Sequence, residues 1–218
     1  ELDDKPAIFS EMAALYADGD EAEWEEFRRY YYASCSMIDH HCGRVIEHLR
    51  ETGRLDNTLV VFYSDHGEMA GDHRLMGKHH TNYESVIHVP AIVRHPATVP
   101  AGSQVEAVIE AVDLMPTVLD AVGADIPRSV DGESRWAAVT GSDDAGSDAV
   151  LLEFATPAGE STKTLLTANY KYWVNERGEE VLFDLQSDPN EFVNRATDPE
   201  AAADLQDMRS RLLHKLIN

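Results

Sequence analysis

The sequence contains no apolar run long enough to cross a membrane, no signal-peptide pattern and only two cysteines. A transmembrane helix needs about 18 or more consecutive apolar residues, so no membrane segment is expected. Two cysteines allow at most one disulfide, and their spacing, given below, argues against it. The chain begins Glu1-Leu2-Asp3-Asp4 without an initiator methionine. We therefore expect it to be a piece of a longer protein.

Lysine is also scarce in this chain. Five Lys and thirteen Arg stand against twenty Asp and twenty Glu, which gives a formal net charge of −22 and a pI near 4.6. Nucleic acids are bound through clustered positive charge, so this composition argues against a nucleic-acid partner. We interpret the acidic excess as a solubilising surface, with a high-salt habitat as the alternative. With 43% hydrophobic residues, 218 residues suffice for a substantial core.

A long amphipathic helix is predicted from Glu21 to a C-terminal cap at Gly53. Its apolar residues recur at helical spacing, at Phe27, Tyr31, Cys35, Ile38, Cys42, Val45 and Leu49. This spacing places the two cysteines on one face, about 10 Å apart and too far for a disulfide. We predict that both are buried core thiols rather than nucleophiles or ligands. Asp39, His40 and His41 fall off this stripe and are expected at the helix surface or behind the direct ligands of a site, rather than in a metal site themselves.

The remaining pattern predicts an α/β fold in two parts. Residues 1–140 are expected to form part of an α/β sheet with flanking helices, and residues 141–218 a small antiparallel meander packed on a helix. The first part is predicted to contain a connecting segment over 1–20, a strand buried on both faces over 59–63, a strand over 91–93 and a helix over 113–123. After a loop over 127–147, the second part is predicted to contain strands over 149–154, 163–168, 170–174 and 181–185, with a turn at Arg177-Gly178 between the last two. A helix is predicted from about Pro199. Its buried face is expected to carry Leu205, Met208, Leu212 and Leu216.

The stretch from Leu59 to Pro90 concentrates the residues that can carry chemistry. In open α/β sheets, ligands bind beyond the carboxyl ends of the strands, which is where Asp65 and His66 follow the strand over 59–63. A carboxylate oxygen and an imidazole nitrogen suit a divalent cation, although two ligands do not complete a site. Lys78 supplies a positive charge that can hold an anionic substrate group.

At this point several segments, in a fixed order, resemble the sulfatase family of the alkaline-phosphatase-like superfamily. The segments are Tyr31-Tyr32-Ala33-Ser34 with Asp39, Gly43-Arg44-Val45-Ile46, Asn57 to Phe62, Ser64-Asp65-His66-Gly67-Glu68, Gly71-Asp72-His73, Gly77-Lys78, Val89-Pro90, Asp113-Leu114-Met115-Pro116-Thr117, Val130-Asp131-Gly132-Glu133-Ser134, Leu182-Phe183-Asp184-Leu185, Asp188-Pro189-Asn190-Glu191 and Asn194. The resemblance covers nearly all of residues 27–217, and it rests on the ordered set rather than on a single piece.

This resemblance implies an alkaline-phosphatase-like sheet and an arylsulfatase-like sulfuric ester hydrolase, which cleaves a sulfate monoester with the help of a divalent cation. Asp65 and His66 would supply half of the cation site, with calcium expected and manganese or magnesium as alternatives. Lys78 would be catalytic and would bind the sulfate, and His79 and His80 are assigned to substrate binding. The substrate would be a small-molecule or carbohydrate sulfate ester.

The nucleophile of the family is a formylglycine made within a Cys-x-Pro-Ser-x-Arg type sequence, and we expect it upstream of this chain. Neither Cys35 nor Cys42 lies in such a sequence. The chain therefore resembles the C-terminal portion of a sulfatase, and residues 1–218 alone are expected to be inactive. If upstream strands are absent, the sheet edge at residues 59–63 is unpaired, which predicts self-association.

Two alternatives stay open at the level of sequence. A phosphonate or phosphodiester hydrolase of the same superfamily would share Asp65, His66 and Lys78. The other alternative is a catalytically incomplete sulfatase-like domain. The family usually has Arg where this chain has His88, so the roles of His88 and of His73 stay open as well.

Overall fold

The computed structural model describes residues 3–78, 82–142, 146–155 and 159–217. The chain divides into two compact units that are each assembled from separated segments. The meander unit comprises Glu1–Gly19, His66–His88 and Asp148–Asn218, and the helix-ribbon unit comprises Asp20–Asp65 and Val89–Ser147. The division into consecutive domains at residue 140 remains a prediction. In the described part of the chain, none of the helices combines the length and the apolar character that a membrane span requires.

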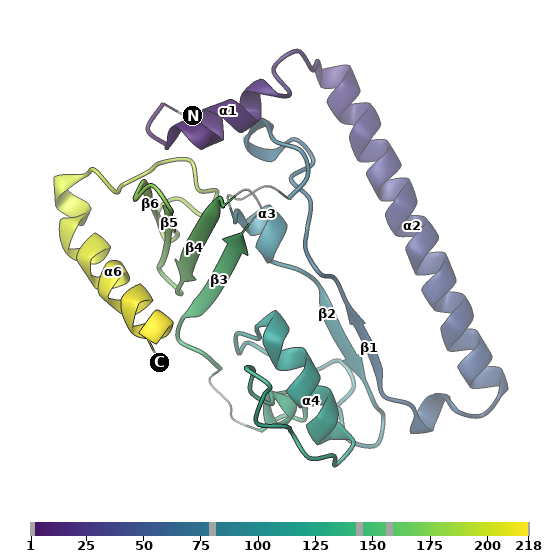
Figure 1. Ribbon diagram of the computed structural model, residues 1–218. Helices are drawn as coiled ribbons and strands as arrows, with labels where there is room; N and C mark the ends of the chain where they lie inside the picture. The colour runs from purple at the N-terminus through teal and green to yellow at the C-terminus, as the bar shows by residue number, and fades with distance from the viewer. Residues whose placement is uncertain (1–2, 79–81, 143–145, 156–158, 218) are drawn as a thin grey trace. The chain divides into compact units, whose positions relative to one another are not determined.

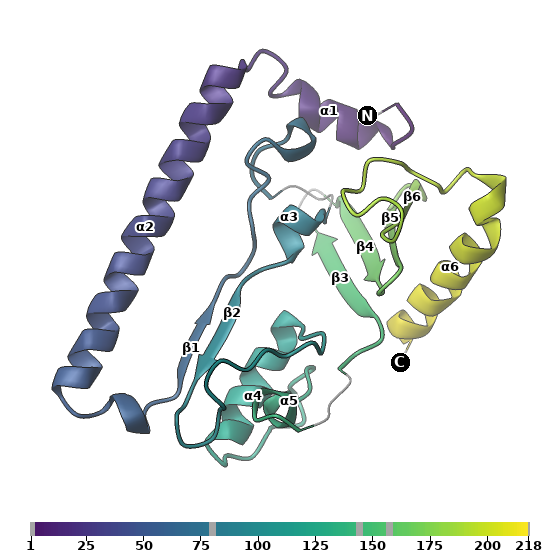
Figure 2. The ribbon, with the colours of Figure 1, turned by 180° about the vertical axis from the view of Figure 1, so that it is seen from behind.

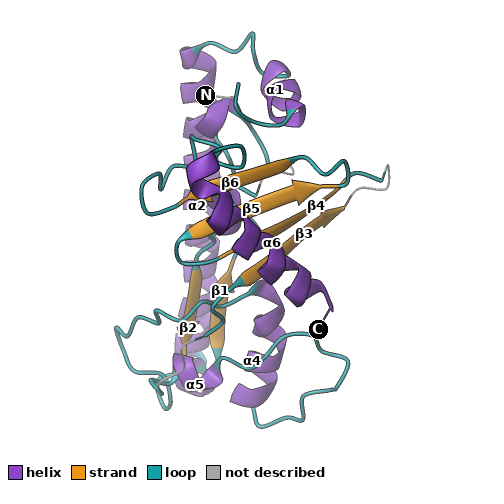
Figure 3. Ribbon diagram, turned by 90° about the vertical axis from the view of Figure 1, so that its left-hand side faces the viewer, coloured by secondary structure: helices purple, strands orange, loops and turns teal. Residues whose placement is uncertain are grey.

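Four antiparallel strands, in the order β3-β4-β5-β6, form the sheet of the meander unit (Figures 1 and 3). They are β3 (Val150–Ala155), β4 (Ser161–Leu166), β5 (Tyr170–Asn175) and β6 (Glu180–Asp184). The sequence places each of them to within two residues. Gly178, in the turn between β5 and β6, has a φ of 74°, a left-handed conformation that glycine adopts without strain. The predicted antiparallel meander is therefore confirmed.

The C-terminal helix α6 (Ala202–Ile217) covers one face of this sheet (Figure 1). Side chains alternate between the two faces along a strand, so every second residue points toward α6. The residues that form this core are Ala149, Leu165, Tyr172, Leu182, Ala201, Leu205, Met208 and Leu212. Three of the four predicted helix residues are therefore buried. The prediction is wrong for Leu216, which lies in the last turn and is 45% exposed.

The opposite face of the sheet is covered by α1 (Ala7–Ala14) and by residues 66–78 and 82–88. This second core consists of Phe9, Met12, Met69, Leu75, Tyr83, Val86, Trp173, Val181 and Phe183. The expectation that residues 1–20 form only a connecting segment is wrong. Phe9 is fully buried and meets Trp173 edge-on, with 5.3 Å between the ring centroids. Such an aromatic contact fixes α1 on the sheet.

In the helix-ribbon unit, β1 (Val60–Tyr63) pairs antiparallel with β2 (Ala91–Arg94) (Figure 2). Both strands lie where the sequence predicts them. The prediction that β1 is buried on both faces is wrong, because Phe62 is 38% exposed and Ile92, opposite it, is 61% exposed. An apolar strand is buried only where a second layer packs on it, and the strand pattern by itself does not supply that layer.

The long helix α2 (Glu21–Glu51) also belongs to the helix-ribbon unit. It begins with a capping box, in which the Asp20 carboxylate accepts from the Glu23 N–H (3.0 Å) and the Glu23 carboxylate accepts from the Asp20 N–H (3.1 Å). Gly53 follows its end with a φ of 66°, as a C-terminal cap requires. The helix and both of its ends therefore agree with the sequence prediction.

The burial predicted for α2 is wrong. None of its residues is buried; Cys35 is exposed and Cys42 is half-buried, so the two thiols are not part of a core in this structure. The 3- and 4-residue spacing produces the helix, but burial needs a partner face, and no described residue of the chain supplies one. Asp39, His40 and His41 are exposed, as expected from their position off the stripe.

The other described α-helices of this unit are α4 (Leu114–Ala121) and α5 (Trp136–Val139). The sequence predicts Asp113 as the N-cap of the helix over 113–123; it does precede α4, but its side chain does not cap that helix. Its carboxylate accepts from the Glu133 N–H (2.9 Å) and pairs with Arg135 Nε (2.9 Å). Asp113 and Arg135 are both buried, and their pairing ties the segment that leads into α5 to the start of α4.

Candidate functional site

The loop from His66 to Lys78 carries most of the predicted site residues that the structure describes. It is anchored by Met69 and Leu75, which are fully buried, and the Glu68 carboxylate closes it by accepting from the Gly77 N–H (2.5 Å). Left-handed backbone conformations occur at Ala70, Gly71, His73, Arg74 and Gly77. Such conformations are costly for residues other than glycine and persist where surrounding contacts fix them. The loop is therefore held in one strained conformation.

Lys78 lies against His66 within this loop. Lys78 Nζ is 3.0 Å from His66 Nε2, and His66 Nδ1 is 2.8 Å from the carbonyl oxygen of Gly67. Because a carbonyl oxygen can only accept, Nδ1 carries the ring hydrogen and Nε2 presents its lone pair to the ammonium group. Lys78 itself is exposed. Two residues twelve positions apart are thus brought together, with a positive charge directed toward solvent.

Asp65 precedes His66 in the chain and is the last residue of the helix-ribbon segment that contains β1. It is exposed. Burial raises the pKa of the neighbouring Tyr63 hydroxyl, and the negative charge of Asp65 raises it further. The carboxylate of Asp65 therefore supplies negative charge at the end of β1, as a cation ligand would need to do.

The structure leaves part of the predicted site undescribed. His79 and His80, which the sequence assigns to substrate binding, lie outside the described residues. Within the described ranges, no group of three or more His, Cys, Asp or Glu side chains is arranged to hold a metal ion. Asp65 and His66 thus stay two candidate ligands of an incomplete set.

The backbone of Gly67 is hydrogen-bonded to the short helix α3 (Glu84–Ile87). The Gly67 N–H donates to the Val86 carbonyl (2.7 Å), and the Glu68 N–H donates to the Ser85 carbonyl (3.1 Å). A Cβ at position 67 would lie 2.0 Å from the Ser85 carbonyl oxygen, so only glycine fits. The backbone next to His66 is therefore hydrogen-bonded to α3 at an approach that only glycine allows.

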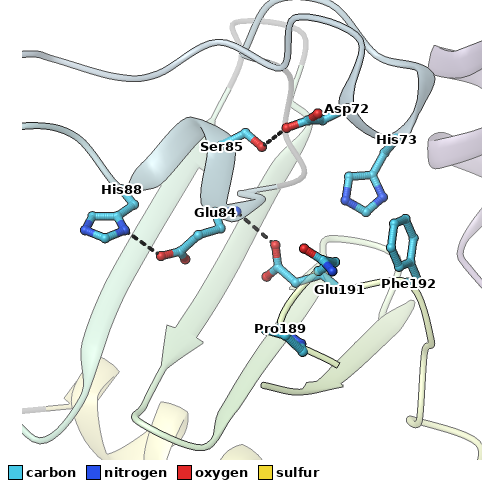
Figure 4. A pocket seen from close by; sticks show the side chains of 9 residues that line it. Asp72, His73, Glu84, Ser85, His88, Pro189, Glu191 and Phe192 are labelled. Atoms are coloured by element: carbon cyan, nitrogen blue, oxygen red, sulfur yellow. Dashed lines mark hydrogen bonds and ion pairs between the residues drawn. The ribbon is translucent and has the colours of Figure 1, made fainter. Parts of the chain in front are cut away.

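A cavity of about 390 Å³ opens beside α3 (Figure 4). Its lining residues are Asp72, His73, Glu84, Ser85, His88, Pro189, Asn190, Glu191 and Phe192. These described residues include no Lys or Arg, and none of Asp65, His66 and Lys78 is among them. The carboxylates would repel an anion, so the lining does not suit a sulfate group.

The two histidines with open roles both line this cavity (Figure 4). The His73 imidazole stacks on the Tyr83 ring, with 3.8 Å between centroids and 9° between planes. His88 Nδ1 lies 2.8 Å from a Glu84 carboxylate oxygen, and its side chain is 77% exposed. His73 is thus packed against the core, whereas His88 is turned to solvent.

A buried ion pair stands next to the cavity. The side chains of Lys171, on β5, and Glu191 are 1% and 2% exposed and contact each other. Burial raises the pKa of the Glu191 carboxyl, and the Lys171 ammonium opposes that rise. The second Glu191 oxygen accepts from the Glu84 N–H, the first of α3 (2.9 Å) (Figure 4).

This ion pair is not apparent from the sequence patterns. Glu191 belongs to a segment that resembles a family signature, and Lys171 belongs to a predicted strand. A signal was available in the sequence, because Lys171 is followed by Tyr172 and Trp173 within a strand expected to pack on a helix. A lysine in such a strand needs a buried partner.

Comparisons with known proteins relate the whole chain to one family. A sequence model described as Sulfatase matches residues 5–124, and one described as N-sulphoglucosamine sulphohydrolase, C-terminal, matches residues 71–218. Arylsulfatase K of Xenopus laevis is 37% identical over 188 residues, which cover 81% of this chain and 35% of that protein. Arylsulfatase of Clostridium perfringens is 34% identical over 190 residues, which cover 85% of this chain and 39% of that protein. The chain thus spans well under half the length of these relatives.

Solved structures share the fold. A 2-O GAG sulfatase superimposes with a TM-score of 0.87 at 24% identity, over 94% of this chain and 46% of that chain. A structure described as in complex with its substrate D-glucosamine-2-N,6-O-disulfate gives 0.82 at 26% identity, over 96% and 45%. The phosphonate monoester hydrolase of Silicibacter pomeroyi gives 0.75 at 38% identity, over 83% and 39%. The predicted partial alkaline-phosphatase-like fold is thereby confirmed, and with two family models that together match residues 5–218, the chain belongs to the sulfatase family.

Proposed function

We propose that the protein containing this chain is an arylsulfatase-like enzyme that hydrolyses a sulfate monoester. The observation that carries the proposal is the contact between Lys78 Nζ and His66 Nε2, 3.0 Å long, in a loop whose backbone is fixed. This contact supports an ammonium group held in place at Lys78, the residue that corresponds to a sulfate-binding lysine in the family that the sequence resembles. The names of the curated relatives support sulfate esters as the substrate class.

In this proposal Lys78 binds the sulfate and stabilises the negative charge that develops as the ester bond breaks. A fixed ammonium group does this without reorganising in the transition state, since its position is set before the substrate arrives. Without a bound cation, His66 holds the Lys78 ammonium group through Nε2, and the His66 ring is oriented by the bond between Nδ1 and the Gly67 carbonyl. His79 and His80 are assigned to further contacts with the substrate.

Asp65 and His66 fit a divalent cation in donor type, because a carboxylate oxygen and an imidazole nitrogen are both common ligands. The Nδ1–H tautomer makes Nε2 the metal-donor atom of His66, so a bound cation would take the lone pair that accepts from Lys78 in this structure. When bound, such a cation polarises the sulfate oxygens. We propose calcium, with manganese or magnesium as alternatives. The remaining ligands, and a formylglycine nucleophile, are proposed to lie outside this chain.

A sulfated carbohydrate is the proposed substrate, because a related structure is described with D-glucosamine-2-N,6-O-disulfate as its substrate. A phosphonate monoester is the second candidate, since the hydrolase of Silicibacter pomeroyi is 38% identical to this chain. Sulfate and phosphonate groups are both tetrahedral anions, which Lys78 would bind in the same way. Self-association through the β1–β2 edge stays a prediction.

The test is a comparison of substrates on the full-length protein. The proposal expects kcat/KM for an aryl sulfate and for glucosamine sulfates to exceed that for an aryl phosphonate monoester and a phosphodiester. It also expects turnover to fall after chelation and to return with calcium. Preference for the phosphonate monoester would favour the second candidate, and turnover of none of these esters would refute both.

A further inference from the structure

The ion pair of Lys171 and Glu191 is bonded to the segment that leads into α3. Charged side chains are costly to bury, and those that stay charged in a core are held by further hydrogen bonds. Lys171 Nζ donates to the Asn82 carbonyl (3.1 Å), and Glu191 accepts from the Glu84 N–H (2.9 Å). Each partner of the pair therefore holds one end of the three-residue entry into α3.

The sheet holds the same segment at a third point. Asn82 Nδ2 donates to Thr164 Oγ1 (2.9 Å), and Thr164, on β4, is fully buried. Asn82 itself has a φ of 49°, a left-handed conformation that asparagine tolerates better than most residues. The segment that leads into α3 is thus hydrogen-bonded to β4, to β5 and to the turn that carries Glu191.

From α3 the contacts continue to the proposed site. The carbonyls of Ser85 and Val86 accept from the Glu68 and Gly67 N–H groups, at 3.1 and 2.7 Å. Because these two hydrogen bonds join the Gly67 backbone to α3 at an approach that only glycine allows, a displacement of α3 would displace the backbone next to His66. Lys78 rests on His66 and would move with it.

We propose that Lys171 and Glu191 are positioning residues, which hold α3 and through it the His66–Lys78 pair in the geometry that binds the ester's anionic group. The catalytic part of this inference rests on the proposed function, whereas the positioning part does not. Lys171 and Glu191 would then act on the site without contacting the substrate, because they fix α3 and α3 supports the site.

A second ion pair in the same unit provides a matched control. Glu180, on β6, pairs with Arg209 of α6, and the Glu180 carboxylate accepts from Arg209 Nε at 2.7 Å. This pair joins sheet and helix on the face away from α3. Glu180→Gln removes one partner of it, just as a change at Glu191 does in the proposed positioning pair.

The first experiment measures amide hydrogen exchange at Gly67 and Glu68, whose N–H groups bond to α3. The double variant K171M/E191Q removes both charges together and leaves no buried charge unpaired. We expect exchange at these two amides to rise about tenfold in this variant and to stay unchanged in E180Q. Unchanged exchange in K171M/E191Q, or an equal rise in E180Q, would overturn the inference. If the double variant does not fold, Glu191→Asp, which keeps the charge beside Lys171 but shortens the reach to the Glu84 N–H, provides the test.

The second experiment measures sulfate-ester kinetics in the full-length protein. Misplacement of a charge by about 1 Å costs up to about 100-fold in rate, so kcat should fall about 10- to 100-fold in K171M/E191Q with a smaller change in KM. E180Q should keep the wild-type kcat. Equal loss of kcat in both variants would mean a stabilising role only. Absence of turnover in the wild type would refute the proposed function, while the exchange experiment would still decide the positioning.

Discussion

Helices α6 and α2 carry the same kind of apolar stripe, yet one is buried and the other is not. On α6, Leu205, Met208 and Leu212 pack into a core with the meander sheet. On α2, no residue is buried, although its stripe is longer. Periodic spacing therefore decides that a helix forms and which side is apolar, whereas burial depends on a second surface. For α6 that surface is in the chain, and for α2 the described residues do not supply it.

The largest expected difference between the two helices comes from a matched pair of methionines. Met208 on α6 is 1% exposed, and Met37 on α2 is 57% exposed. Met208→Ala should lower the free energy of unfolding by about 2–5 kcal/mol, because it leaves a cavity in the core. Met37→Ala should change it by no more than about 0.5 kcal/mol. Urea denaturation measures both, and equal losses would contradict the burial of Met208 in the core and the exposure of Met37 on α2.

A pH dependence should also separate α6 from α2. The hydrogen bond from Arg209 lowers the pKa of Glu180, which burial partly opposes. A carboxyl whose pKa is lower in the folded state stabilises the fold above its unfolded pKa of about 4.3, and this stability is lost as the pH falls through the folded pKa. As the pH drops below about 4.3, the melting temperature of Glu180→Gln should therefore fall less steeply than that of the wild type.

The matching change on α2 is Glu25→Gln. Glu25 pairs with Arg29 at 2.7 Å, and both side chains are more than half exposed. Exposed pairs of this kind contribute little, so the melting curve of this variant should follow the wild type at every pH. Parallel acid limbs for the wild type and Glu180→Gln would argue that the Glu180–Arg209 pair does not hold α6 on the sheet.

The smallest expected effect concerns the cysteines of α2. Because Cys35 is exposed, Cys35→Ser should change the free energy of unfolding by no more than about 0.5 kcal/mol. In the native 218-residue chain, Cys35 should react with a thiol reagent before Cys42, which is half-buried. A protected Cys35, or a loss of about 1–3 kcal/mol on introducing the hydroxyl, would restore the buried thiol that the spacing predicts.

Local patterns predicted the elements well, because they depend on neighbouring residues. The start of α2 at Glu21, the cap at Gly53 and the strands of the meander all follow from short-range spacing. Burial and pairing were harder, since they depend on residues far away in the sequence. Glu191 bonds to Glu84, 107 positions earlier, and nothing in either neighbourhood specifies that contact.

The candidate site divides in the same way. The sequence identifies Asp65, His66 and Lys78 by residue type and by the order of their segments. It does not give the contact between His66 and Lys78, which depends on the left-handed turns of the loop between them. Nor does it give the role of α3, since the close approach at Gly67 exists only once the loop and helix meet.

The most direct test of the central claim is the sulfate-ester turnover of Lys78→Ala in the full-length protein, with Lys215→Ala as the control. Lys215 lies near the end of α6 and is exposed, so its loss removes the same charge away from the proposed site. Removal of a preorganised charge at the reacting group costs about 100-fold or more in kcat. We predict that loss for Lys78→Ala and wild-type turnover for Lys215→Ala. Near-normal turnover in Lys78→Ala would contradict the account.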